Sequence, residues 1–127
     1  MDRRELGQAG ERLAADHLRA KGYRIVERNR RTATGEIDLI VTAPDGTLVF
    51  VEVRARRGAA AGELTAADQA AASIDRRKQH RLWELAEEYL GERELTGDAR
   101  IDVVAVALGH DGRLIEVRHY ENAVQGG

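Results

Sequence analysis

Apolar and polar residues alternate along two neighbouring runs near the middle of the chain, between Gly35 and Arg54. A period of two is typical of β-strands, and the segment Pro44-Asp45-Gly46 between the runs is a strong turn signal, so the stretch predicts a β-hairpin. If these three residues form the loop, Ala43 faces Thr47, and partner residues have numbers that sum to 90. One face of the hairpin is then apolar and carries Ile37, Leu39, Val41, Val49, Val51 and Val53.

The opposite face of the predicted hairpin is charged. Asp38 lies opposite Glu52 on it, and Arg54 shares this face because strand side chains alternate. Two carboxylates with Cβ atoms roughly 5 Å apart repel each other, and a hard divalent cation such as Mg²⁺ would turn that repulsion into a binding site. Two alternatives stay open. Both acids could lie at frayed, solvated ends of the hairpin, or a two-residue loop would place them on opposite faces. Glu36 is either a further carboxylate of this site or a cap at the start of the strand.

Residues 3–21 predict a helix that ends at Gly22. Its apolar stripe consists of Leu6, Leu13, Ala14, His17 and Leu18. The pattern alone leaves Glu11, at the edge of this stripe, open between a boundary residue that reaches water and a residue of the site. Gly7 and Gly10 each cost about 1 kcal/mol inside a helix, so the pair predicts a close approach between this helix and another backbone.

The remaining patterns complete a predicted order of α-β-β-β-α-β-β. The predicted bounds are a short strand at 23–28, a basic loop at 29–34, a helix from its N-cap Ser73 to Gly91, an interior strand at 99–108 and an edge strand at 113–120. The alanine-rich run at 58–72 predicts a mobile loop with some local helix. Asp102, near the start of the interior strand, is predicted to be a structural acid that pairs with a basic residue. The final residues, 123–127, predict a disordered tail, which leaves a single domain over residues 1–122.

The composition is that of an ordinary globular protein with one core. The chain has 127 residues, of which 43% are hydrophobic and 33% are charged. It has no cysteine, which excludes a disulfide framework and thiolate zinc sites and fits a reducing compartment. No apolar run approaches the roughly 18 residues that span a bilayer, and the N-terminus lacks the apolar core of a secretory signal. We therefore expect a cytoplasmic protein that makes no membrane contact.

The net charge of −2 does not by itself indicate nucleic-acid binding. Binding needs only a local positive face, however, and the basic residues occur in groups. The groups are Arg28, Arg30 and Arg31, then Arg54, Arg56 and Arg57, and then Arg76, Arg77, Lys78 and Arg81. Acids concentrate between Glu84 and Glu94, so the chain is polarised rather than uniformly acidic.

The arrangement Asp-x13-Glu-x-Arg on a hairpin between two helices resembles the PD-(D/E)xK nuclease superfamily. More closely, the chain resembles the YraN-like family of restriction-endonuclease-fold proteins, which are relatives of archaeal Holliday-junction resolvases. The resemblance is carried by GQAGERLAADHLRAKGYRIVERNRR, GEIDLI, VFVEVR and RIDVVAV, which cover most of residues 7–108. It implies an α/β fold with a restriction-endonuclease-like core, in which helices flank a mixed central β-sheet.

The resemblance also implies roles for individual residues. Asp38 and Glu52, with Glu11 from the first helix, would hold Mg²⁺ or Mn²⁺. The superfamily has a lysine where this chain has Arg54, and an arginine stays protonated, so it cannot act as a base. Arg54 would still stabilise phosphate charge, and Lys78 on the second helix would supply the role of the missing lysine.

The implied function is hydrolysis of DNA phosphodiester bonds by a metal-dependent nuclease. Resolvase relatives act as dimers on branched DNA, so the resemblance extends to branched substrates and a homodimer. The residues expected to hold the DNA backbone through non-specific charge contacts are Arg30, Arg31, Arg56, Arg57, Arg76 and Arg77. Two other classes of function stay open, a nucleic-acid-binding module without turnover and an interaction scaffold that keeps the nuclease fold.

Overall fold

A computed structural model describes residues 2–58 and 74–125 of the protein. The helices in this part of the chain are α1 (Arg3–Ala20) and α3 (Arg76–Glu92), and the strands are β1 (Arg24–Arg31), β2 (Glu36–Thr42), β3 (Leu48–Arg57), β4 (Ala99–Leu108) and β5 (Leu114–Tyr120). The predicted order α-β-β-β-α-β-β is confirmed, and so is the mixed α/β class.

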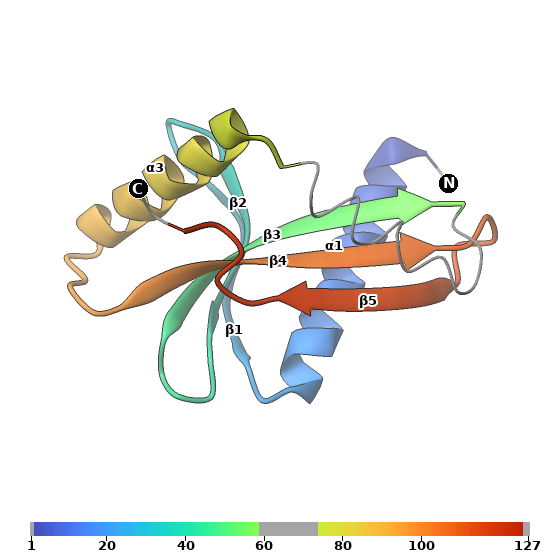
Figure 1. The fold of residues 1–127 in the computed structure, drawn as a ribbon, viewed down its shortest axis with the longest axis horizontal. Helices are drawn as coiled ribbons and strands as arrows, with labels where there is room; N and C mark the ends of the chain where they lie inside the picture. The colour runs from blue at the N-terminus through green and yellow to red at the C-terminus, as the bar shows by residue number, and fades with distance from the viewer. Residues whose placement is uncertain (1, 59–73, 126–127) are drawn as a thin grey trace.

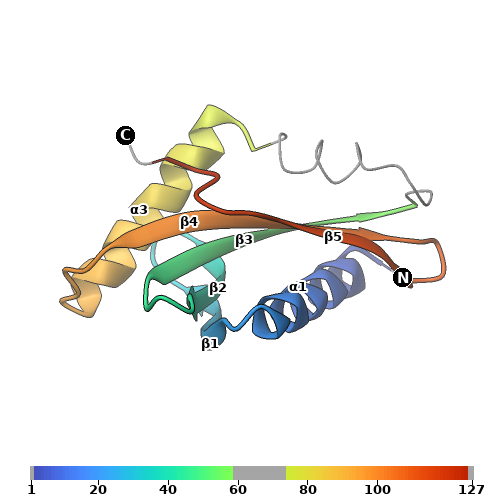
Figure 2. The same cartoon turned by 60° about the horizontal axis from the view of Figure 1, so that its bottom comes forward.

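The strands form one sheet in the order β1-β2-β3-β4-β5, in which β3 and β4 run parallel and the other neighbours run antiparallel (Figure 1). α1 lies on one face of this sheet and α3 on the other (Figure 2). β4 lies inside the sheet and is buried along most of its length, which confirms the predicted interior strand. β5 lies at the edge, as its more polar sequence predicted.

Alternation along the strands produces two apolar cores, one on each face of the sheet. The core under α1 contains Ala14, Leu18, Leu39, Val41, Val49, Val51, Val104 and Val106, and the core under α3 contains Ile37, Ile40, Phe50, Leu82, Leu85, Tyr89, Ile101 and Val103. Each helix therefore buries its apolar stripe against one face of the same sheet.

The predicted register of the hairpin is confirmed. The Ala43 amide donates to the Thr47 carbonyl over 2.8 Å, and the pairs run from Thr42 opposite Leu48 to Leu39 opposite Val51. Of the six residues predicted on the apolar face, Ile37 is a correction, because it packs in the core under α3. It lies beyond the last β2–β3 pair, where β2 is held by β1 alone and the alternation of the hairpin no longer applies.

Several boundaries differ from the predicted ones. β1 continues to Arg31, so the predicted loop at 29–34 shortens to residues 32–35. The N-cap of α3 is Asp75, whose carboxylate accepts from the Lys78 amide over 2.8 Å. The predicted cap, Ser73, and nearly all of the predicted loop at 58–72 lie outside the described residues. Aspartate and serine cap helices about equally well, so the pattern could not choose between two nearby candidates.

The predicted disordered tail is also corrected in part. Val124 is only 2% exposed and packs in the core under α3, and the Trp83 indole donates to the Val124 carbonyl over 3.0 Å. An apolar side chain with a core position to fill thus holds the chain in place past residue 122.

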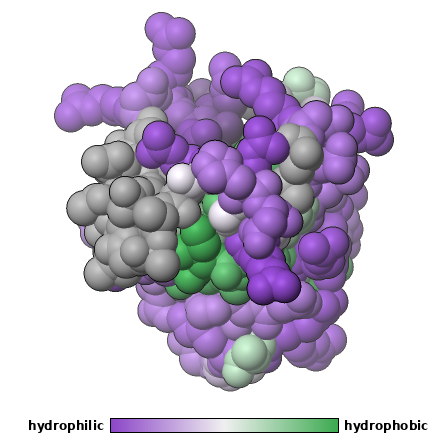
Figure 3. Space-filling view, turned by 90° about the vertical axis from the view of Figure 1, so that its right-hand side faces the viewer, coloured by the Kyte–Doolittle hydropathy of each residue, from purple (hydrophilic) through white to green (hydrophobic). Residues whose placement is uncertain are grey.

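The described surface is mainly polar. The face in Figure 3 is covered largely by hydrophilic residues around one small hydrophobic area. Among the described residues, the large apolar side chains that are exposed, Val26, Leu95 and Leu114, are far apart in the sequence. In the same part of the chain, neither helix combines the length and the hydropathy that a membrane crossing requires. The cytoplasmic location stays a prediction.

Candidate metal centre

Asp38 and Glu52 lie where strands β2 and β3 separate. The last pair between these strands is Leu39 opposite Val51, and each acid is the next residue beyond this pair. Beyond it, β3 stays paired with β4, and the Val53 amide donates to Asp38 Oδ2 over 2.9 Å. The side chain of Asp38 thus bonds to a β3 amide beyond the last β2–β3 pair. The separation of the strands leaves room for side chains from both helices to reach the same place.

Asp38 is held in a poorly solvated position. Together with Glu52 it lines a void of about 10 Å³, whose other walls are Ile37, Phe50, Val51, Leu82 and Ile101. Burial, and next the charge of Glu52, raise the pKa of Asp38 to about 8, and the charge of Glu11 adds to this in the same direction. Asp38 therefore tends to keep its proton at neutral pH as long as no cation offsets the neighbouring carboxylates.

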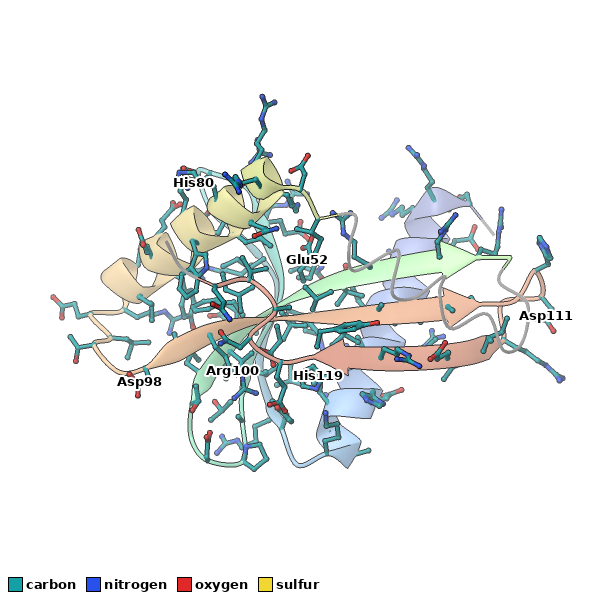
Figure 4. All side chains as sticks on the ribbon, in the orientation of Figure 1. Glu52, His80, Asp98, Arg100, Asp111 and His119 are labelled. Atoms are coloured by element: carbon teal, nitrogen blue, oxygen red, sulfur yellow. The ribbon has the colours of Figure 1, made fainter. Side chains whose placement is uncertain are left out.

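Glu52 is 6% exposed and is contacted by two cations. Lys78 Nζ, from the first turn of α3, lies 3.3 Å from Glu52 Oε2, and Arg54 Nε lies 3.7 Å from the same oxygen. Figure 4 shows Glu52 on β3 beside the beginning of α3. Arg54 Nε is buried and has no hydrogen-bond partner within the part of the chain that the structure describes. Both positive groups predicted to act on phosphate thus lie at the same carboxylate.

α1 brings Glu11 to the site through a close contact with β3. A Cβ atom added to Gly10 would lie 2.6 Å from Ala55 Cβ, which is closer than two such atoms can approach. The predicted backbone approach is therefore confirmed for Gly10. It is wrong for Gly7, where an added Cβ atom would meet nothing within 4 Å.

Three carboxylates gather at the end of this contact. Glu11, Glu36 and Asp38 each offer an oxygen, and these oxygens all lie within 4.8 Å of one another. Glu36, which the sequence left open between ligand and cap, thus belongs to the cluster, whereas Glu52 lies next to it and points toward Lys78. Carboxylate oxygens are the donors that hard cations such as Mg²⁺ and Mn²⁺ prefer, so the residues present fit such an ion.

Asn29 was not among the predicted site residues. Its Nδ2 atom donates to Glu11 Oε1 over 2.6 Å and to Glu36 Oε1 over 3.0 Å. The sequence could not reveal it, because a bulge between Ile25 and Glu27 shifts the pairing of β1 with β2, and alternation counted from Tyr23 does not include such an irregularity.

The predicted DNA-contacting arginines differ in their surroundings. Arg30 is used within the fold, since it pairs with Glu27 over 3.3 Å and with Glu92 over 3.0 Å and joins β1 to α3. Arg31 is 88% exposed and lies 3.7 Å from Glu36, beside the cluster. The others, Arg56, Arg57, Arg76 and Arg77, are exposed. Alternation places Arg56 on the face of Glu52 and Arg57 on the opposite face. A role of these residues in holding DNA stays a prediction.

Comparison with known proteins identifies the family. The model of the uncharacterised protein family UPF0102 matches residues 10–106. The chain belongs to the UPF0102 family. This UPF0102 chain is 46% identical over 122 residues to a UPF0102 protein of Pelotomaculum thermopropionicum, which covers 95% of this chain and 96% of the relative. It is 42% identical over 125 residues to a UPF0102 protein of Roseiflexus castenholzii, and this alignment covers 97% of this chain and 95% of the relative. The resemblance to the YraN-like family is thereby confirmed.

Among solved structures, the UPF0102 chain aligns with Pyrococcus furiosus SfsA in complex with Ca²⁺. The alignment covers 94% of this chain and 64% of the other, at 17% identity and a TM-score of 0.37. A similarity this low carries no argument about the site.

Proposed function

We propose that this chain is a metal-dependent nuclease that hydrolyses phosphodiester bonds in DNA. Glu11, Asp38 and Glu52 would hold Mg²⁺ or Mn²⁺, with Glu36 beside them. The observation that supports this best is the gathering of carboxylates at one point, three of them within 4.8 Å and the fourth lining the same void as Asp38. Close carboxylates repel one another, and burial increases that repulsion. A fold that needed only a stable core would have no use for such a cluster.

The neighbouring cations suit the chemistry of phosphoryl transfer. A divalent cation bound at the carboxylates would polarise the scissile phosphate and lower the pKa of a water molecule. Lys78 and Arg54, both at Glu52, would donate to phosphate oxygens and stabilise the charge that develops on them. Arg54 cannot take up the proton of the water, because a guanidinium stays protonated. Lys78 is thus the side chain that would orient this water.

A binding module without turnover is the second candidate. Arg54 favours it, because the superfamily has a lysine at this position. The third class, an interaction scaffold, would require no metal. The homodimer remains part of the proposal and follows from the resemblance to resolvases. The cytoplasmic location also remains part of it and rests on the composition.

The test is cleavage of labelled linear, flapped and four-way-junction DNA in the presence of Mn²⁺ or Mg²⁺. Branched DNA is included because of the resemblance to resolvases. Wild type is compared with Asp38→Asn and Glu52→Gln, which keep the shapes of the side chains and remove their charges. Glu87→Gln serves as the matched control, because it makes the same charge change at an exposed position of α3. We expect cutting by wild type and by the control, and at least a hundredfold slower cutting by both site variants, of the order found when a metal ligand is removed.

The outcomes separate the three classes. If no protein cuts but all bind DNA with a strong dependence on salt, the chain is a binding module. If wild type shows neither cutting nor a heat of Mn²⁺ binding, the scaffold remains. Cutting that survives in Asp38→Asn would mean that the activity comes from another site or another protein.

A further inference from the structure

Asn29 lies among the carboxylates although it carries no charge. Its amide group has two hydrogens, and it donates to Glu11 Oε1 over 2.6 Å and to Glu36 Oε1 over 3.0 Å. One neutral side chain thus uses both of its donors on two acids of the cluster. These acids come from different elements, α1 and β2, so the amide also connects the helix to the sheet.

The backbone places Asn29 next to the third acid as well. β1 pairs with β2 through Arg28 opposite Leu39 and Arg30 opposite Ile37, so Asn29 lies opposite Asp38. Its φ angle is 49°, in the left-handed region that only glycine, asparagine and aspartate adopt readily. Of these three residues, asparagine alone has a side chain that can donate hydrogen bonds. The backbone therefore favours these three residues, and the neighbouring acids explain why asparagine is the one present.

The donor at Asn29 differs from the donors at Glu52. Lys78 and Arg54 offset the charge of Glu52 with positive charges of their own. A divalent cation that bound Glu52 would have to displace these two side chains. The amide of Asn29 holds two acids by hydrogen bonds alone and leaves their negative charge in place. Each carboxylate has two oxygens, so Glu11 can keep one oxygen with the amide and offer the other to a cation. The second oxygen of Glu36 lies 3.7 Å from Nε of the exposed Arg31, which a cation would displace.

We infer that Asn29 is a positioning residue, which holds Glu11 and Glu36 together beside Asp38 so that the three carboxylates are arranged before a divalent cation binds. The inference rests on the proposed metal centre, since it assigns the arrangement to that ion. Residues that hold metal ligands through hydrogen bonds commonly change metal affinity by ten- to a hundredfold when they are replaced.

The test uses the only other asparagine of the chain as its control. Asn122 has a φ angle of 51°, like Asn29, and its backbone amide, rather than its side chain, contacts Asp102. Asn29→Gly and Asn122→Gly therefore relieve the same backbone strain, but only Asn29→Gly removes donors from the acids. We expect Asn29→Gly to bind Mn²⁺ about tenfold more weakly than wild type in calorimetric titration. Asn122→Gly should bind it like wild type.

A second variant tests the hydrogen bonds without metal. Asn29→Asp keeps the size of the side chain and suits the same φ angle, but it replaces both donors with a further carboxylate. It should melt at a lower temperature than Asn29→Gly in the absence of metal, because the added charge repels Glu11 and Glu36. Saturating Mn²⁺ should narrow this difference in melting temperature between the two variants. If Asn29 served only the backbone, Mn²⁺ would leave the difference unchanged.

Two results would overturn the inference. The first is an Asn29→Gly variant that binds Mn²⁺ as tightly as wild type, because the asparagine would then serve the backbone alone. The second is an Asn29→Asp variant that, without metal, melts no lower than Asn29→Gly, because the two acids would then not be held at this side chain. Failure of wild type to bind Mn²⁺ is a separate result. It would refute the proposed metal centre, while the comparison without metal would still decide whether the amide holds the acids.

Discussion

Asp102 on β4 is fully buried and Asp38 on β2 is half-buried, and their electrostatic surroundings are opposite. Asp102 is 0% exposed and accepts from Arg100 Nε over 3.0 Å and from the Asn122 amide over 2.8 Å, and its Oδ2 lies 2.7 Å from His119 Nε2. Burial pushes the pKa of Asp102 up, but the hydrogen bonds from His119, Arg100 and the Asn122 amide outweigh it, so the pKa lies below its ordinary value. The predicted pairing of Asp102 with a basic residue is confirmed.

Among the described residues, Asp38 has fewer hydrogen-bond donors for its charge than Asp102 has. It accepts from the Val53 amide, but burial and the charge of Glu52 prevail and raise its pKa to about 8. Figure 4 shows that Arg100 and His119, the partners of Asp102, lie close together and away from Glu52. Burial of an acid alone therefore does not mark a binding site. A buried acid that the fold supplies with donors is structural, whereas one that is crowded by other acids is a candidate to bind a ligand.

The largest expected effect on stability comes from replacing Asp102, the acid that is supplied with hydrogen-bond donors. Asp102→Asn should lower the free energy of unfolding by about 3–5 kcal/mol, because it leaves the charge of Arg100 without its partner and turns an NH₂ group toward other donors. Urea denaturation at pH 7 measures this loss. Since the pKa of Asp102 is lowered by folding, its contribution is complete above the ordinary value of 3.8 and is lost as the pH falls below it. The difference between variant and wild type should therefore shrink in acid.

The exposed acid Asp98 provides the control for this measurement. Asp98→Asn should change the free energy of unfolding by no more than about 0.5 kcal/mol. A loss of under about 1 kcal/mol in Asp102→Asn would mean that its hydrogen bonds add little beyond the cost of burying the acid.

Replacing Asp38, the acid crowded by other carboxylates, should change the free energy of unfolding in the opposite direction. Asp38→Asn should raise the free energy of unfolding of the metal-free protein, on the order of 3 kcal/mol at pH 8. The folded protein keeps the Asp38 proton up to about pH 8, while the unfolded chain loses it near 3.8. Wild type therefore loses stability as the pH rises between these values, and the neutral amide of the variant does not. The gain should be absent near pH 4 and grow toward pH 8 in thermal or urea denaturation.

If Asp38→Asn is less stable than wild type at pH 8, the Asp38 carboxylate has a favourable partner for its charge. The contrast with Asp102 would then disappear, and with it the main physical reason to place a cation at this point of the sheet.

Much of the fold was predictable from residue patterns. The turn formers Pro44-Asp45-Gly46 determined the hairpin register, and a two-sided apolar run identified β4 as an interior strand. The helix glycine Gly10 indicated where α1 meets β3. In each case the signal is local, because a turn, a run or a missing Cβ atom is visible in a few consecutive letters.

The missed features depend on contacts between distant parts of the chain. Asn29 faces the cluster because a bulge at Val26 changes the pairing of β1, and no period in the sequence marks that bulge. Glu52 points toward Lys78 rather than into the group of three carboxylates because α3 begins above it. Spacing along the chain can bring acids to one region, but the choice among neighbouring partners is made by tertiary packing.

The smallest expected effect on stability comes from replacing two glycines of α1, which tests the packing of this helix near Asp38. Gly10→Ala should lower the free energy of unfolding by about 1–3 kcal/mol, because the new methyl group must push α1 away from Ala55. Gly7→Ala on the same helix has open space around it and should raise stability by about 0.5–1 kcal/mol through helix propensity. The pair thus makes one chemical change in two settings, and urea denaturation compares them directly.

The pH dependence of this pair links it to the two aspartates. Glu11 follows Gly10, so an outward shift of α1 also moves a negative charge away from Asp38, whose pKa that charge helps to raise. The loss caused by Gly10→Ala should therefore be smaller at pH 8, where the acids crowd one another, than at pH 5. Gly7→Ala should show no such difference, and neither variant should alter the acid response that depends on Asp102. An equal loss at both pH values would show that the crowding at Asp38 does not depend on where α1 lies.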